Sequence, residues 1–124
     1  MSLKSPIGRA RGLGSAKDGL HHWWMQRLTA IALIPLGIWF VISMISLAGA
    51  DHAAASAWLA NPLTAVLMLL LIVATFHHLQ LGLQVVIEDY IHSEAAKVVC
   101  LIGLKLASFA LGVAAVFAVL KVAF

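Results

Sequence analysis

Three long apolar stretches run along the chain, and short segments in which polar residues gather separate them. The first covers about residues 25–48 and has no charged residue between Leu28 and Leu47. The second covers about 62–88 and the third about 95–120. Because a helix of about 20 apolar residues crosses the hydrocarbon core of a bilayer, this pattern predicts an all-α integral membrane protein with three transmembrane helices.

Polar residues at the ends of these stretches indicate where the helices begin. Asp18 is a candidate N-cap for the first helix, and Ser93 for the third. Asn61 followed by Pro62 marks the start of the second. Such side chains accept hydrogen bonds from the free N–H groups of a first turn, and proline suits the first helical position.

The composition agrees with this pattern. Of the 124 residues, 63% are hydrophobic and 10% are charged, and the mean hydropathy is +1.03. A small soluble domain has too much surface to hide so much apolar material. We expect one membrane domain over 1–124, with a polar tail at 1–20 and a short connection at 48–60. A separate catalytic domain has no room, so the chain is expected to belong to a larger assembly.

The basic residues predict how the helices are oriented. The net charge is +3, and no Lys or Arg lies between the first two spans. Most of the basic residues lie in the N-terminal tail, at the start of the first span or at the start of the third: Lys4, Arg9, Arg11, Lys17, Arg27 and Lys97. Cytoplasmic loops are rich in Lys and Arg. The N-terminus is therefore expected in the cytoplasm, and the positive charge is read as a topology signal with no nucleic-acid partner.

Two adjacent histidines, His77 and His78, lie within the second span. Ionisable residues at membrane depth tend to be functional, and neutral imidazole is a common axial ligand of haem iron. Gly82 lies on the same helix face as His78 and leaves a groove suited to a flat macrocycle. Two other interpretations stay open, which are a hydrogen bond to a neighbouring helix and a proton relay.

A haem held by His78 poses the question of its second ligand. The first and third spans contain no histidine, and His21 and His22 are expected at the membrane surface. A six-coordinate haem would therefore take its other ligand from another polypeptide. Cys100 is the only cysteine and no C-x-x-C-H motif is present, so covalent c-type attachment is excluded.

Polar residues near the membrane surface offer further chemistry. Asp89 follows His78 on the same helix face, about 16 Å further along at 1.5 Å per residue. Asp89 and Tyr90 are suited to hydrogen bonds and proton transfer at a quinone carbonyl, or else they form an ordinary polar and aromatic interface. Arg27, with His21, is suited to a haem propionate, or else it anchors the helix at the inside surface.

Two segments resemble a known family. The stretch HHWWMQRLTA from His21 to Ala30, and the spacing His78-x-x-x-Gly82 followed by Asp89-Tyr90, are similar to the hydrophobic membrane anchor subunit of succinate dehydrogenase. This is the D-type, cytochrome b anchor of respiratory complex II. The resemblance covers nearly the whole chain. The doubled histidines depart from the simplest pattern, and the positions of Gly82 and Asp89 select His78 over His77.

The resemblance implies a function. D-type and C-type anchors pair and hold one haem b between them, so His78 is the expected axial ligand. Arg27 and His21 match positions near the haem propionates, and Asp89 and Tyr90 match the ubiquinone site. The implied partners are a C-type anchor, an iron–sulfur subunit and a flavoprotein subunit, in the bilayer of the bacterial inner membrane. The chain itself would be a non-catalytic anchor. The alternatives are a stand-alone membrane cytochrome b and a small proton-coupled transporter subunit.

Overall fold

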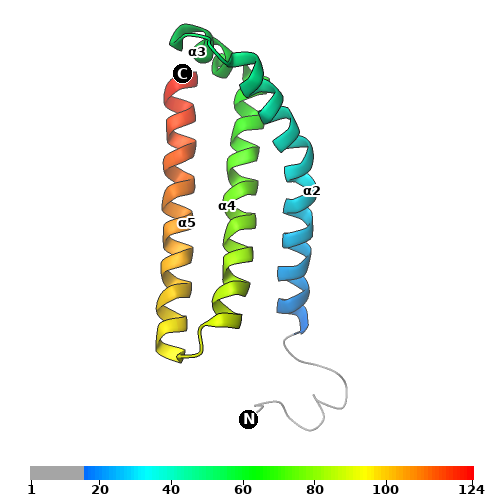
Figure 1. The fold of residues 1–124 in the computed structure, drawn as a ribbon, viewed down its shortest axis with the longest axis vertical. Helices are drawn as coiled ribbons and strands as arrows, with labels where there is room; N and C mark the ends of the chain where they lie inside the picture. The colour runs from blue at the N-terminus through cyan, green and yellow to red at the C-terminus, as the bar shows by residue number, and fades with distance from the viewer. Residues whose placement is uncertain (1–15) are drawn as a thin grey trace.

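The computed structural model describes residues 16–124, and this part of the chain is helical and contains no strand (Figure 1). Its four helices are α2 (Ala16–Leu47), α3 (His52–Ala60), α4 (Pro62–Tyr90) and α5 (Glu94–Ala123). Three of them are long and apolar enough to cross a membrane, with candidate spans at Gly19–Leu47, Pro62–Tyr90 and Glu94–Ala123. The prediction of an all-α fold with three transmembrane helices is confirmed.

The starts of α4 and α5 follow the predicted capping signals. Asn61 Oδ1 accepts a hydrogen bond from the Leu63 N–H at 3.0 Å, and Pro62 is the first residue of α4. The Ser93 hydroxyl oxygen accepts from the Ala96 N–H at 3.4 Å. Each side chain satisfies a backbone donor that has no partner within its own helix.

The start of α2 differs from the sequence-based expectation. The helix already includes Ala16 and Lys17, so Asp18 lies inside α2 and is not its cap. Alanine is the strongest helix former, and its presence favours helix over the last part of the segment expected as a polar tail. Three of the basic residues used for the orientation, Lys4, Arg9 and Arg11, lie outside the described residues.

The connection between the first two spans contains the short helix α3, which sequence reasoning did not predict. Gly49, with φ of +81°, ends the turn after α2 in a conformation that glycine adopts easily. Asp51 Oδ1 then caps α3 by accepting from the Ala54 N–H at 2.9 Å. Trp58 of α3 stacks on Trp39 of α2, with ring centroids 5.7 Å apart. This stacking packs α3 against α2.

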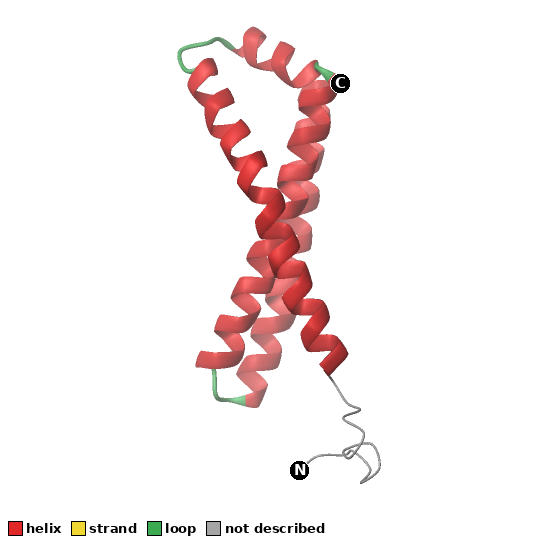
Figure 2. Ribbon diagram, turned by 90° about the vertical axis from the view of Figure 1, so that its right-hand side faces the viewer, coloured by secondary structure: helices red, strands yellow, loops and turns green. Residues whose placement is uncertain are grey.

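The three long helices form a narrow bundle in which α4 packs against both α2 and α5. In Figure 2, α2 crosses the other two helices at an angle, and α3 lies across one end. The start of α2, the end of α4 and the start of α5 meet at the opposite end (Figure 1). We call this opposite end the Tyr90 end.

The bundle buries few of its own side chains. In the described part of the chain, the buried hydrophobic residues are Ala65, Ala74, Leu81 and Val119, and the buried polar residues are Thr29 and Ser108. Most of the large apolar side chains are exposed. Because exposed apolar surface of this extent is unfavourable in water, this surface is suited to contact with lipid or with other membrane helices.

Candidate functional site

Polar groups meet where the first half of α2 packs on the second half of α4. We call this region the polar α2–α4 contact, and it consists of His22, Gln26 and Thr29 of α2 against His78, Leu81 and Gly82 of α4. The three α2 residues are spaced four and three positions apart, so they share one face of their helix. The predicted haem ligand His78 therefore lies against a polar stripe of the first span.

His78 is held in this contact by Thr29. The Nδ1 atom of His78 lies 3.0 Å from the Thr29 hydroxyl oxygen, between residues 49 positions apart in sequence. The same hydroxyl also donates within α2, at 2.7 Å from the Met25 carbonyl oxygen and 3.1 Å from that of Gln26. Thr29 is only 7% exposed. Of the two His78 ring nitrogens, Nε2 forms no hydrogen bond with the described residues.

Two further contacts join α2 to α4 toward the Tyr90 end. His22 Nε2 lies 3.2 Å from the Leu81 carbonyl oxygen. The side-chain nitrogen of Gln26 lies 3.7 Å from the point where a Cβ on Gly82 would stand. The groove expected over Gly82 is therefore covered by Gln26. The Gln26 Oε1 atom is buried and has no hydrogen-bond partner among the described residues, so this amide has unused capacity.

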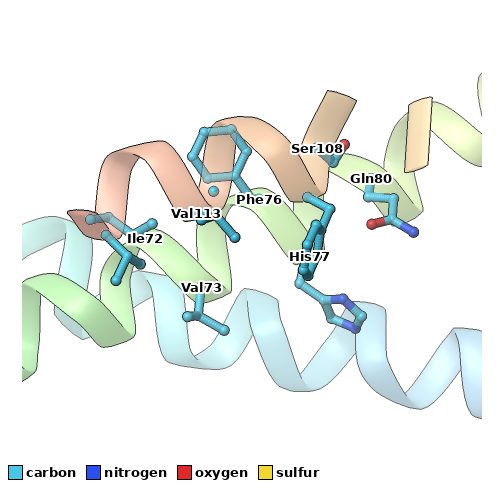
Figure 3. A pocket seen from close by; sticks show the side chains of 10 residues that line it. Ile72, Val73, Phe76, His77, Gln80, Ser108 and Val113 are labelled. Carbon is cyan, nitrogen blue, oxygen red and sulfur yellow. The ribbon is translucent and has the colours of Figure 1, made fainter. Parts of the chain in front are cut away.

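His77 has different surroundings from its neighbour. It borders a cavity of about 330 Å³ between α4 and α5, together with Phe76, Gln80 and Ser108 (Figure 3). It also borders a second cavity, of about 280 Å³, between α2 and α4. The Nε2 atom of His77 is buried and has no hydrogen-bond partner within residues 16–124. Among the described residues, the His78 ring is therefore anchored by a hydrogen bond to Thr29, whereas the buried Nε2 of His77 has no partner.

Most of the remaining predicted site residues lie toward the Tyr90 end. Asp89 and Tyr90 form the last residues of α4, both are exposed, and the Tyr90 side chain is 77% exposed. His21 and Arg27 of α2 are exposed as well. The Arg27 guanidinium lies over the Trp23 ring, 5.6 Å from its centroid. His21, Asp89 and Tyr90 therefore lie toward the Tyr90 end, whereas Arg27 lies two residues before Thr29, and none of the four forms a hydrogen bond with His78.

Charged partners are scarce in the part of the chain that the structure describes. The ion pair found there joins Lys97 Nζ to Glu94 Oε1 at 3.9 Å, within the first turn of α5. Glu88 accepts a hydrogen bond from Gln84 at 3.0 Å. No group of three or more His, Cys, Asp or Glu side chains gathers within residues 16–124. The site therefore offers single imidazoles, which suit an axial haem position, and no cage for a bare metal ion.

Sequence reasoning did not identify Thr29 and Ser108 as buried polar residues of two different helices. Thr29 lies within the His21–Ala30 stretch that carries the family resemblance, but that resemblance does not pair it with His78. A usable signal was its spacing from His22 and Gln26, because polar residues repeated along one face of an apolar helix indicate a contact with another helix.

The comparisons with known proteins agree on one family. Residues 1–120 match the model of the succinate dehydrogenase/fumarate reductase transmembrane subunit. The chain is 34% identical over 117 residues to a succinate dehydrogenase hydrophobic membrane anchor subunit of Rickettsia bellii, covering 94% of each chain. It is 38% identical over 90 residues to that of Rickettsia conorii, covering 72% of this chain and 71% of the relative. For Paracoccus denitrificans the identity is 29% over 97 residues, covering 78% and 75%.

Proposed function

The chain belongs to the succinate dehydrogenase/fumarate reductase transmembrane subunit family, and from this premise we propose that it shares a b-type haem with a second membrane anchor and contributes to a ubiquinone site. It is a multi-pass membrane anchor subunit, and its relatives are consistent with the bacterial inner membrane. As an anchor subunit it would hold the flavoprotein and iron–sulfur subunits of that enzyme at the membrane.

The contact between Thr29 and His78 carries the haem proposal. It engages Nδ1 of His78 at 3.0 Å and leaves Nε2 without a hydrogen bond to the described residues. An imidazole with one nitrogen engaged and the other available is the form in which histidine binds haem iron. When bound, the haem supplies a one-electron carrier within the membrane. His78 would hold it from this chain.

A second anchor subunit would supply the other axial ligand. His22 is near His78 along the bundle, but its Nε2 is engaged with the Leu81 carbonyl. The side chain of His77 is rotated about 100° around the axis of α4 from that of His78, and it borders the cavity between α4 and α5. The exposed apolar surfaces of α2 and α4 leave room for a partner helix. We therefore propose a C-type anchor that packs on these two helices.

Arg27 and His21 are suited to the propionates of this haem. Arg27 is exposed, and its guanidinium has no carboxylate partner among the described residues. Its donors would pair with a propionate carboxylate in a charge-assisted hydrogen bond. The cation–π contact with Trp23 would hold the guanidinium near the membrane surface.

Asp89 and Tyr90 are suited to a ubiquinone at the Tyr90 end. The exposed Tyr90 hydroxyl would donate a hydrogen bond to a quinone carbonyl, and Asp89 would supply or relay protons. The lysines and arginines that predict a cytoplasmic N-terminus would put this end on the cytoplasmic side. The flavoprotein and iron–sulfur subunits would then dock there, so that electrons need not cross the bilayer to reach the quinone.

Purification of the intact complex through a tag on this chain tests the proposal. We expect flavoprotein, iron–sulfur and second anchor subunits to co-purify, and a reduced-minus-oxidised spectrum to show a b-type haem. An intact complex without a haem signal would overturn the haem part of the proposal. A haem that remains fully bound when this chain is purified away from the second anchor would overturn the shared site.

A further inference from the structure

We propose that Thr29 is a positioning residue that selects the protonation form of the His78 ring, with the hydrogen on Nδ1 and the lone pair on Nε2. This inference rests on the proposed role of His78 as a haem ligand. It concerns a residue of α2 that would act through His78 and would not touch the iron itself.

Thr29 has a single hydroxyl proton, and the short contacts of its oxygen locate that proton. Its oxygen lies 2.7 Å from the Met25 carbonyl oxygen, which is the usual spacing of an O–H···O hydrogen bond. A carbonyl can only accept, and two oxygens this close repel unless a hydrogen lies between them. The Gln26 carbonyl oxygen, at 3.1 Å, lies in the same turn of α2. The proton therefore points back into α2.

The remaining contact of the Thr29 hydroxyl oxygen is with Nδ1 of His78. With its proton directed to Met25, the Thr29 oxygen can only accept from His78, so Nδ1 must carry the hydrogen across the 3.0 Å separation. Neutral imidazole carries a hydrogen on only one of its two nitrogens, and Nε2 is then left with its lone pair. Because the two ring nitrogens point in different directions, Nε2 also points away from Thr29.

Burial makes this selection effective. Thr29 is 7% exposed, so water has little access to replace its oxygen as the acceptor. A partner on the distal nitrogen of a ligating histidine orients the ring and raises the basicity of the ligand. The adjacent His77 has no such partner in the described part of the chain. Thr29 thus distinguishes the two neighbouring histidines through a contact between helices.

The test compares variants of the complete succinate dehydrogenase complex. Thr29→Val keeps the shape of the side chain and removes the hydroxyl, and Thr29→Ser restores it. Ser46→Ala is the matched control, because the Ser46 hydroxyl also donates within α2, to the Ile42 carbonyl at 3.0 Å, and forms no hydrogen bond with a histidine of the described residues. Haem content per complex, the midpoint potential of the haem and the g-values of the ferric haem are measured for each variant.

We expect Thr29→Val to weaken haem retention by about 10- to 100-fold, which is the usual cost of losing such a partner. The remaining haem should have a higher midpoint potential, because a less basic ligand stabilises ferric iron less. Thr29→Ser and Ser46→Ala should resemble the unchanged complex. If Thr29→Val prevents assembly, Thr29→Ala replaces it in the same comparison with Thr29→Ser.

Three results overturn the inference. In the first, Thr29→Val or its alanine replacement leaves the haem content, the potential and the g-values unchanged. In the second, Thr29→Ser is as impaired as the variant without a hydroxyl. In the third, Ser46→Ala causes the same changes. All three presuppose haem in the unchanged complex, and its absence there would instead refute the proposed function.

Discussion

The two faces of α4 present adjacent histidines with opposite surroundings. Toward α2, His78 is engaged by a buried hydroxyl within a contact made of polar side chains. Toward α5, the residues around the cavity bordered by His77 are mostly apolar, and the Nε2 atom of His77 has no partner within residues 16–124. The side chains around each ring, and not depth in the membrane alone, therefore distinguish one histidine from the next.

A glycine on each side of α4 allows a matched pair of substitutions, and one of the two is expected to have the largest effect on haem retention among these tests. Gly82 faces Gln26, and Gly112 of α5 faces Phe76 beside the larger cavity. Gly82→Leu would crowd the Gln26 side chain and strain the packing of α2 on α4 beside Thr29 and His78. Overpacking of this kind costs about 1–3 kcal/mol. We expect roughly five- to hundredfold weaker haem retention, measured as haem per purified complex.

Gly112→Leu is the control for this substitution. The added side chain enters a cavity of about 330 Å³, so haem content should stay close to that of the unchanged complex. Equal loss of haem in the two variants would show that any disturbance of the bundle releases the haem, and the polar α2–α4 contact would have no special role.

Tyr90→Phe separates the proposed quinone site from both faces of α4. A hydrogen bond contributes about 1 kcal/mol, so its removal should slow succinate-dependent quinone reduction by about five- to tenfold. Haem content should not change, and succinate oxidation with an artificial acceptor should stay intact. Both activities are measured on the same preparation. An equal fall in the two would make Tyr90 a structural residue of the exposed end of α4.

The smallest effect is expected at the opposite end, where Trp58 of α3 stacks on Trp39. Trp58→Ala removes an aromatic pair, which contributes about 0.5–1.5 kcal/mol beyond its buried area. The complex should unfold at a slightly lower temperature in a thermal melt, while its haem spectrum stays unchanged. A lost or altered haem spectrum would indicate that α3 also helps to position the α2–α4 contact.

The spans and most of the caps could be predicted because their signals are local. The apolar windows define the three long helices, and Asn61-Pro62 and Ser93 satisfy the first turns that follow them. The family resemblance drawn from the His21–Ala30 and His78–Tyr90 segments is confirmed by the family match and the relatives. Helix α3 was missed although its alanines favour a helix, because its nine residues are too short a segment to show an apolar periodicity.

The contact of Thr29 with His78 could not be predicted, because it depends on how α2 crosses α4. These residues lie 49 positions apart, and the polar face of α2 indicates a contact with another helix but not which residue of α4 it meets. The same reason explains Gly82. A groove beside a glycine is a local expectation, but Gln26 covers it from another helix. The roles of His78, Arg27, His21, Asp89 and Tyr90 stay predictions.

The most direct measurement of the difference between the two faces is the b-type haem signal of two alanine variants. His78→Ala and His77→Ala are purified as whole complexes, and their reduced-minus-oxidised spectra are compared per flavin. We expect His78→Ala to lose most of the signal and His77→Ala to keep most of it, because, among residues 16–124, the His78 ring is anchored at Nδ1 and the His77 ring is not. Loss of the signal in His77→Ala with retention in His78→Ala would contradict the account.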